Sequence, residues 1–276
     1  MKLRISLAQL NFRFGAVDEN VTRAIEWIKK SADIGSDLVL LPELWASGYD
    51  LENWVKYATP INGGVFKLLT EYAHKYNITI GSSLLEAKDR RAYNTFVLHG
   101  CDGKIWGVYR KIHRFRLLQE EKWLGAGDTL ALAKTTWGLV GLSTCYDLRF
   151  PEMFRPYAAA GARLSLIVAE WPERRVVHWS KLLQARAIEN QMFVAGVNKV
   201  GESQGVKLGG YSAVVDPWGN LLVEGRDSED LLTIDIDLEE ADKARRHIPV
   251  FQDRRPDIYH REMDDHFPVE NNCLDD

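Results

Sequence analysis

The stretch Gly141-Leu-Ser-Thr-Cys145-Tyr-Asp-Leu-Arg-Phe-Pro-Glu152 marks a place where a buried strand gives way to a helix. The apolar run from Trp137 to Leu142 predicts the strand. Pro151 suits the first turn of a helix, because proline lacks an N–H group that this position would leave unbonded. Apolar and small residues then recur at helical spacing, at Phe154, Tyr157, Ala158 and Gly161. A strand followed directly by a helix is typical of α/β folds.

Cys145 lies at the turn between these two elements, close to the start of the predicted helix. Backbone N–H groups at such an end favour a thiolate, the nucleophilic form of cysteine, and can also stabilise an oxyanion. The alternative is that Cys145 is a small buried hydrophobe, which is the usual role of a free cysteine. The choice depends on which polar residues the rest of the chain supplies.

Two further segments place a charged residue where an apolar strand ends. The residues Asp37-Leu-Val-Leu-Leu-Pro lead into Glu43, and Lys104-Ile-Trp-Gly-Val-Tyr-Arg leads into Lys111. A carboxylate can take the proton of a thiol and later activate water, whereas an ammonium can stabilise an oxyanion without transferring a proton. Glu43, Lys111 and Cys145 therefore form a complete set for acyl transfer.

The chain resembles the nitrilase superfamily, the carbon–nitrogen hydrolases, whose Glu-Lys-Cys triad these three segments match in order and separation. The resemblance extends from about Leu3 to about Asp237. Other matching stretches are Ala169-Glu-Trp-Pro, His178-Trp, Gln184-Ala-Arg-Ala-Ile-Glu-Asn-Gln and Tyr211-Ser-Ala-Val-Val-Asp-Pro-Trp-Gly. It implies an amidase that acts through a cysteine thioester and needs no metal or organic cofactor.

The resemblance also implies a second glutamate beside the lysine. Counting back from the turn Ala126-Gly-Asp assigns this position to Glu120, although the adjacent Glu121 leaves a one-residue ambiguity. Its implied role is to position the substrate and the lysine. The alternative is a solvated acid in a charged surface loop.

Three aromatic residues are candidates for lining the substrate pocket, namely Tyr49, Tyr146 and Trp171. The backbone N–H of Tyr146 can join Lys111 in holding an oxyanion, whereas Tyr49 and Trp171 could equally be core residues. A histidine is the commoner activator of a thiol, so His113 and His178 are alternatives. Neither has the surrounding sequence of a Cys–His pair, which favours Glu43 as the base.

Apolar periodicity predicts alternating strands and helices. Strands are expected at 3–10, 37–41, 78–84, 93–99, 104–109, 137–142, 164–168, 193–197, 211–215, 221–223 and 231–236. Helices are expected from near Asp18 to Gly35, with Val21, Ile25, Ile28 and Ala32 on one face, and at 65–76, after Pro151 and at 176–192. The resemblance implies an α/β fold, a four-layer α-β-β-α sandwich that pairs into a homodimer or a larger homo-oligomer. We expect a single domain over 1–276, with a C-terminal extension from about 245 that lies on another surface or is partly disordered.

Composition is consistent with a cytoplasmic enzyme that acts on a small molecule. The chain has 276 residues, of which 46% are hydrophobic, and a formal net charge of −4, so nothing favours binding to nucleic acid or to an anionic membrane. Apolar and polar residues alternate over the first seven residues, which is typical of a strand, whereas a signal peptide has a continuous apolar core. The cysteines are few and widely spaced, which predicts neither a disulfide framework nor a metal site: Cys101, Cys145 and Cys273.

Within the superfamily, the runs around Cys145 and Trp171 are most similar to the omega-amidase branch, which hydrolyses the terminal amide of 2-oxoglutaramate and 2-oxosuccinamate. Deaminated-glutathione amidase is a close neighbour. A carboxylate-bearing substrate needs a fixed cation, and Arg149, Arg174 and Arg175 are candidates. A nitrilase proper, an N-carbamoyl hydrolase and a non-catalytic binding protein on the same fold remain as alternatives.

Overall fold

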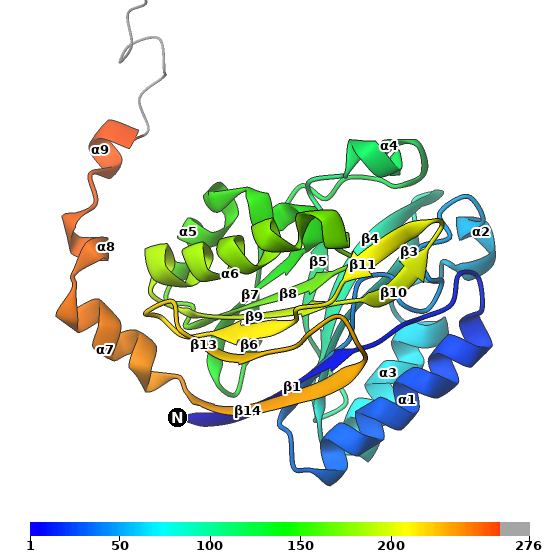
Figure 1. Cartoon of the computed structure of the whole chain (residues 1–276), viewed down its shortest axis with the longest axis horizontal. Helices are drawn as coiled ribbons and strands as arrows, with labels where there is room; N and C mark the ends of the chain where they lie inside the picture. The colour runs from blue at the N-terminus through cyan, green and yellow to red at the C-terminus, as the bar shows by residue number, and fades with distance from the viewer. Residues whose placement is uncertain (260–276) are drawn as a thin grey trace, which may run out of the picture.

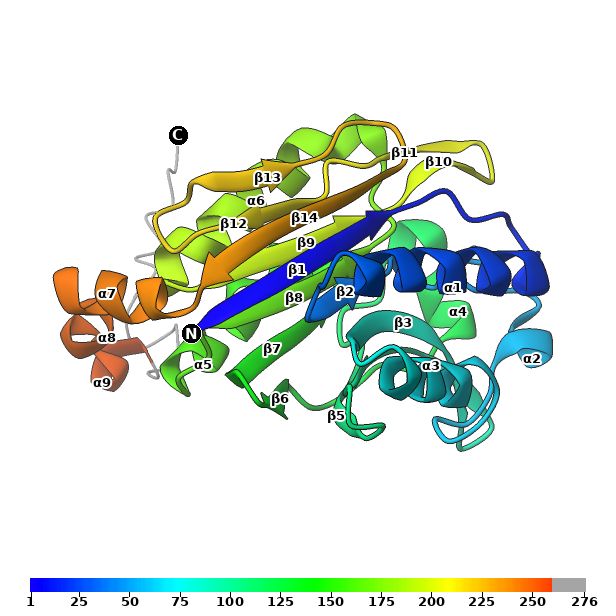
Figure 2. The same ribbon diagram turned by 90° about the horizontal axis from the view of Figure 1, so that it is seen from below.

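The computed structural model describes residues 1–259, and within them two large β-sheets pack face to face (Figures 1 and 2). Cys273 lies outside the described residues. The first six-stranded sheet has the order β14-β1-β2-β3-β4-β5. Its strands are β1 (Lys2–Gln9), β2 (Leu38–Leu40), β3 (Thr79–Lys88), β4 (Arg91–His99), β5 (Ile105–Arg110) and β14 (Asp230–Asp237).

The second six-stranded sheet has the order β13-β12-β9-β8-β7-β6, and a separate hairpin joins β10 and β11. The strands are β6 (Ala131–Thr135), β7 (Gly138–Thr144), β8 (Leu164–Ala169), β9 (Phe193–Asn198), β10 (Val200–Ser203), β11 (Val206–Gly209), β12 (Ala213–Val215) and β13 (Leu221–Glu224). In both sheets the central pairs are parallel, β1-β2-β3 in one and β7-β8-β9 in the other. The carboxyl ends of neighbouring parallel strands therefore meet at one edge of each sheet.

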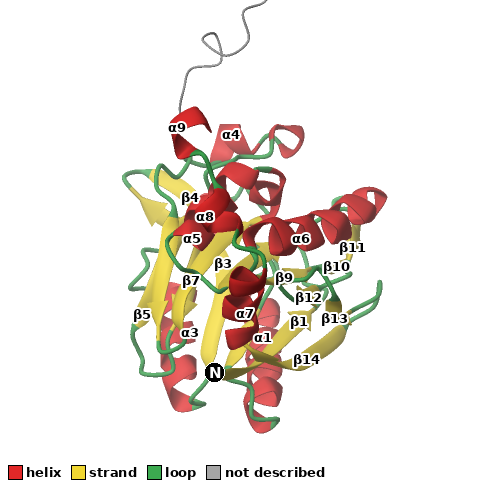
Figure 3. Ribbon diagram, turned by 90° about the vertical axis from the view of Figure 1, so that its left-hand side faces the viewer, coloured by secondary structure: helices red, strands yellow, loops and turns green. Residues whose placement is uncertain are grey.

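Helices cover the outer face of each sheet (Figures 1 and 3). On the first sheet these are α1 (Val17–Asp33) and α3 (Gly64–Lys75), and on the second α5 (Pro151–Ala159) and α6 (Val176–Asn190). The predicted four-layer α-β-β-α sandwich is thus confirmed. The other helices of the described residues are α2 (Trp54–Tyr57), α4 (Glu120–Trp123), α7 (Glu239–His247), α8 (Val250–Asp253), α9 (Pro256–Tyr259) and the 3₁₀ segments Arg116–Leu118, Cys145–Arg149 and Glu173–Arg175. Among the described residues, no helix has the length and apolar character that a membrane crossing requires.

Alternation along the strands explains why both faces of each sheet are covered. Leu38 and Leu40 of β2 belong to the core between the sheets, whereas Val39 between them packs with the residues under α1 and α3. Successive side chains of a strand point to opposite faces, so a strand that is apolar at every position must be buried on both. The run Asp37-Leu-Val-Leu-Leu-Pro therefore folds as a central strand.

Two features differ from the sequence prediction. The buried face of α1 is centred on Asn20, Ala24 and Ile28, because the Asn20 amide bonds to the backbone of Arg13 and Ala46 and brings a polar residue inward. The hairpin of β10 and β11, strand β6 and helix α7 were not predicted; their short or highly charged sequences carry weak periodicity.

The C-terminal segment begins by packing on its own chain. The Gln191 amide, just after α6, donates to the carbonyl oxygens of Ala244 and Ile248, and the Arg245 guanidinium donates to the carbonyl of Ala162 at 2.6 Å. Helices α7 to α9 then extend along one end of the sandwich (Figure 1).

Burial of His99 makes the stability of the fold sensitive to acid. The ring is fully buried, and this burial lowers its pKa from the ordinary value of 6.5 to about 3. Between about pH 3 and pH 6.5, His99 therefore carries a proton in the unfolded chain but not in the folded chain. As a result, the free energy of unfolding falls as pH drops below about 6.5.

We expect a His99→Phe variant to lose less free energy of unfolding between pH 7 and pH 5 than the wild type does, by about 2 kcal/mol. Urea titrations at the two pH values measure this difference. An equal loss in both proteins would contradict the assignment.

Candidate active site

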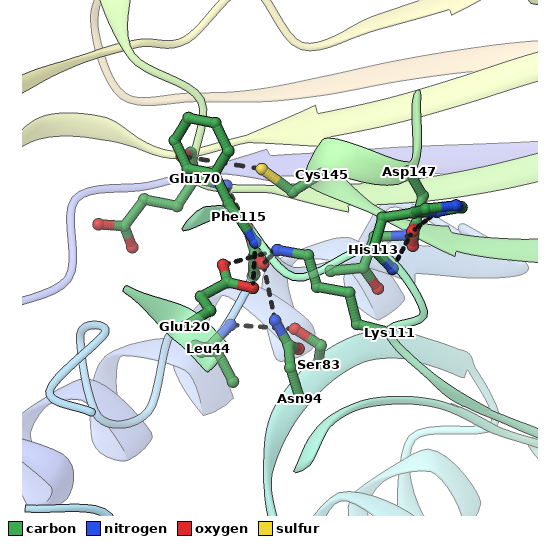
Figure 4. A network of polar contacts seen from close by, with 12 residues as sticks. Leu44, Ser83, Asn94, Lys111, His113, Phe115, Glu120, Cys145, Asp147 and Glu170 are labelled. Atoms are coloured by element: carbon green, nitrogen blue, oxygen red, sulfur yellow. Dashed lines mark hydrogen bonds and ion pairs between the residues drawn. The ribbon is translucent and has the colours of Figure 1, made fainter. Parts of the chain in front are cut away.

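The predicted triad residues converge from both sheets onto one edge of the sandwich, and Figure 4 shows two of them, Lys111 and Cys145. Glu43 follows β2, Lys111 directly follows β5, and Cys145 directly follows β7. The Lys111 N–H still donates to the carbonyl of Asn94 at 2.9 Å, which continues the β4-β5 ladder and fixes where its side chain leaves the sheet.

Lys111 bridges two buried carboxylates. Its Nζ lies 2.8 Å from Oε1 of Glu43 and 2.8 Å from Oε1 of Glu120, and all three side chains are at most 1% exposed. Glu43 is further held by the Asn94 amide, which donates to Oε1 at 2.7 Å, and by the Glu170 N–H, which donates to Oε2 at 3.0 Å. Both oxygens of Glu43 thus have fixed partners, which orients the carboxylate.

The charge of this lysine is set by its partners. Burial alone would lower the pKa of Lys111, but the negative charges of Glu120 and Glu43 raise it well above its ordinary value. Lys111 is therefore a permanent ammonium, suited to stabilising negative charge and unsuited to giving up a proton.

Glu120 rather than Glu121 lies beside the lysine. Glu120 Oε2 accepts the Phe115 N–H at 2.9 Å, and its Oε1 accepts the Tyr49 hydroxyl. Burial raises the pKa of Glu120; Lys111 opposes this effect and Glu43 adds to it. Glu121 is exposed at the surface.

Cys145 occupies a strained turn. It has a φ of 49°, a left-handed conformation that costs free energy for a non-glycine residue and is often found at functional sites. The thiol is 7% exposed and donates to the carbonyl of Glu170 over 4.0 Å.

Asp147 holds this turn in place. Its Oδ2 accepts the Thr144 N–H at 2.9 Å and the Tyr109 hydroxyl at 2.7 Å, and its Oδ1 accepts the His113 N–H at 3.1 Å. His113 Nδ1 lies 2.8 Å from the same Oδ1, and its ring stacks on Phe150. His113 thus binds Asp147 in this structure, and His178 is exposed and contacts Arg149.

The expectation that the helix start favours a thiolate is wrong. Burial raises the pKa of the Cys145 thiol well above its ordinary value, and the negative charge of Glu43 raises it further, while Lys111 only partly opposes them. The helical turn at Cys145 is a five-residue 3₁₀ segment, so its dipole is small against these effects. The resting thiol is therefore neutral, and a nucleophilic role for Cys145 would require a base.

A small cavity opens beside the thiol. Tyr49, Tyr146 and Trp171, the three aromatic residues predicted to line the pocket, all line this cavity. Arg149, Glu170 and Arg175 line it as well. Several of the same residues also line an outer cavity of about 390 Å³, to which Arg174 contributes as well. Arg174 does not reach the inner cavity.

Sequence reasoning did not assign roles to several residues of this site. Asn94 and Asp147 support the triad through their side chains, and Glu170 through its backbone. Glu170 stands in the matching stretch Ala169-Glu-Trp-Pro, but a backbone contact leaves no signature of residue type that a sequence could reveal.

Known proteins share this architecture. A model of the family described as carbon-nitrogen hydrolase matches residues 4–246. The chain is 38% identical over 260 residues to a 2-oxoglutaramate amidase of Bacillus subtilis (strain 168), covering 94% of this chain and 100% of the relative. It is 35% identical over 270 residues to an omega-amidase of Homo sapiens, covering 94% and 98%. A crystal structure of a CN-hydrolase superfamily protein from Xanthomonas campestris superposes with a TM-score of 0.87 at 31% identity, covering 92% and 98%.

Removal of the central ammonium should destabilise the protein in a pH-dependent way. In Lys111→Met, Glu120 loses the charge that lowers its pKa, so its folded-state pKa rises further above the unfolded value. A raised carboxyl pKa costs stability as pH rises, so the deficit relative to the wild type should grow from pH 5 to pH 8 and reach about 3–5 kcal/mol.

Denaturant titrations at both pH values measure this deficit. The matched control is Lys122→Met, which removes an exposed lysine of α4 and should change stability little. A deficit in Lys111→Met that is independent of pH would contradict the electrostatic explanation.

Proposed function

The chain belongs to the carbon–nitrogen hydrolase family, and from that membership we propose that it is a thiol amidase of the omega-amidase type. Its substrate is the terminal amide of a small 2-oxo acid, 2-oxoglutaramate or 2-oxosuccinamate, and its products are the 2-oxo acid and ammonia. The observation that carries the proposal is one cavity that brings the Cys145 thiol together with two arginines, beside the Lys111–Glu43 pair.

The first half of the reaction forms a thioester. Glu43 takes the proton of Cys145, and the sulfur attacks the amide carbonyl carbon. The Lys111 ammonium and the Tyr146 N–H stabilise the oxyanion of the tetrahedral intermediate. The carbon–nitrogen bond then breaks as Glu43 returns the proton to the nitrogen, which leaves as ammonia.

The second half releases the acid. Glu43 takes a proton from water, the resulting hydroxide attacks the thioester, and the carbon–sulfur bond breaks as the proton passes to the sulfur. Glu120 keeps Lys111 aimed at the oxyanion through the 2.8 Å ion pair and helps to position the substrate. No step requires a metal or an organic cofactor.

Two arginines are placed to bind the substrate carboxylate. Arg149 and Arg175 line the inner cavity, and within the described part of the chain neither forms an ion pair. They lie over aromatic rings, Arg149 4.8 Å from the centre of Trp171 and Arg175 5.3 Å from that of Phe115. Burial lowers the pKa of Arg175, and Arg174 and Arg149 lower it further, a repulsion that a bound carboxylate would relieve.

A second candidate is deaminated-glutathione amidase, because the outer cavity of about 390 Å³ gives room for a longer amide. An N-carbamoyl hydrolase or a nitrilase would use the same triad with another pocket shape. A non-catalytic binding protein would not require a base, an ammonium and a thiol together.

We further propose a single domain over 1–276 that works in the cytoplasm as a homodimer or larger homo-oligomer, with no nucleic-acid or membrane partner. Val177 and Ile188 of α6 are 66% and 52% exposed, which supports a helical face that another copy covers.

The proposal predicts ammonia release from 2-oxoglutaramate but not from a nitrile, an N-carbamoyl amino acid or deaminated glutathione. Cys145→Ala should abolish release and leave the melting temperature near that of the wild type, because a small side chain replaces a small one at a buried site. A coupled ammonia assay and thermal unfolding measure the two properties.

Cys101→Ala is the matched control, since Cys101 lies in the turn between β4 and β5 and should not affect turnover. Turnover of another member of the panel alone would keep the triad and overturn the substrate. Ammonia release by Cys145→Ala would overturn the mechanism.

The arginine assignment predicts that Arg175→Met lowers kcat/KM for 2-oxoglutaramate on the order of 10- to 100-fold, because a charged hydrogen bond is lost. Arg174→Met, one residue away and facing only the outer cavity, should change it little. Equal effects of the two changes in steady-state kinetics would contradict the assignment.

A further inference from the structure

We propose that Lys199 and Glu170 are positioning residues. Their buried ion pair fixes the backbone of residue 170, and this backbone holds the Glu43 carboxylate and the Cys145 thiol in position relative to each other. The inference rests on the proposed roles of Glu43 as base and Cys145 as nucleophile. It assigns a role to two residues outside the triad, which act on Glu43 and Cys145 through the backbone of residue 170.

The backbone of Glu170 contacts both reacting groups. Its N–H donates to Oε2 of Glu43 at 3.0 Å, and its carbonyl oxygen accepts the Cys145 thiol over 4.0 Å (Figure 4). Glu43 comes from the first sheet and Cys145 from the second. A shift of this one residue would therefore change the position of the base relative to the thiol.

The flanking residues are anchored to the end of β9. The Ala169 carbonyl accepts the N–H of Lys199 at 3.1 Å and that of Glu43 at 3.4 Å. The Trp171 N–H donates to the Asn198 side chain at 2.6 Å, and the same amide donates back to the Trp171 carbonyl at 3.2 Å. Residues 169 and 171 are thus held by the dipeptide 198–199.

The side chain of Glu170 completes this anchor. Lys199 Nζ lies 3.2 Å from Oε2 of Glu170, and the side chains are 0% and 5% exposed. A buried ion pair is a weak source of net stability, since apolar residues of similar volume often serve as well. Its benefit here is better explained by the conformation that it imposes on residue 170.

The carboxylate of Glu170 does not act on the thiol directly. Figure 4 shows it turned away from the sulfur of Cys145, toward the other side of its own backbone. It lines both the inner and the outer cavity, so contact with the substrate is the competing explanation. A positioning role predicts a loss of kcat, whereas substrate binding predicts a rise in KM.

The test uses Lys199→Met, Glu170→Gln and the double variant in the full-length protein. Lys199→Met should still fold, because burial already favours the protonated form of Glu170, which becomes neutral when its partner is removed. The double variant removes both charges and keeps the test valid if one single variant fails to fold.

We expect Lys199→Met to lower kcat on the order of 10- to 100-fold with KM changed little, because small misplacements of reacting groups have effects of this size. The alkylation rate of Cys145 by iodoacetamide, measured by mass spectrometry of its peptide, should fall by a similar factor. The double variant should be no slower than the slower single variant, since the two residues act as one unit.

Lys207→Met is the matched control, because Lys207 pairs at 2.5 Å with Glu173 at the surface and should leave both rates unchanged. A lower melting temperature with unchanged kcat and alkylation would overturn the inference, and so would a raised KM alone. The Glu43→Gln variant tests the proposed function separately. If this variant leaves kcat and the alkylation rate unchanged, Glu43 is not the base, and the proposed function fails rather than the positioning role of Lys199 and Glu170.

Discussion

The ion pairs of Lys111 with Glu43 and Glu120 are the constraint on which the rest of the site depends. Two carboxylates buried this close together repel each other and lose their hydration, and one ammonium at 2.8 Å from each makes the arrangement tolerable. The requirement runs in both directions, because the same carboxylates keep the buried lysine charged. Glu43, Glu120 and Lys111 thus form one electrostatic unit, in which each charge offsets the cost of burying the others.

This unit determines how the thiol is used. Beside a net negative environment the sulfur stays protonated, since burial and Glu43 outweigh Lys111 in setting the pKa of Cys145. A neutral thiol is a poor nucleophile, so in the proposed mechanism proton removal accompanies attack and depends on the alignment of Glu43. A cysteine activated by a permanent cation would not depend on its base in this way. In that mechanism the groups that align Glu43, namely the Asn94 amide and the N–H of Glu170, act on the reaction through the base.

The sequence predicted those parts of the molecule that rest on local pattern. Apolar runs located the central strands, and the charged residues that end them, Glu43 and Lys111, lie where the strand ends predicted. What could not be predicted depends on contacts between distant segments. Asn20 is buried because its amide bonds to Arg13 and Ala46 across a loop, and the pKa of Cys145 depends on burial that no local pattern reveals. The resemblance to a known family pointed to Glu120 but left Glu121 open, and the structure shows that Glu120 lies beside the lysine.

The position of the site at the seam between two sheets explains why it needs anchors beyond the triad. Glu43 and Lys111 are carried by the first sheet and Cys145 by the second, so their spacing depends on how the sheets pack. Among the polar contacts that cross this seam, the Tyr109 hydroxyl of β5 donates to Asp147, two residues after Cys145, and Glu43 accepts the N–H of Glu170. The apolar core between the sheets is non-directional and tolerates small shifts, whereas hydrogen bonds are directional. The core thus brings the sheets together, and these bonds convert an approximate packing into a defined geometry at the site.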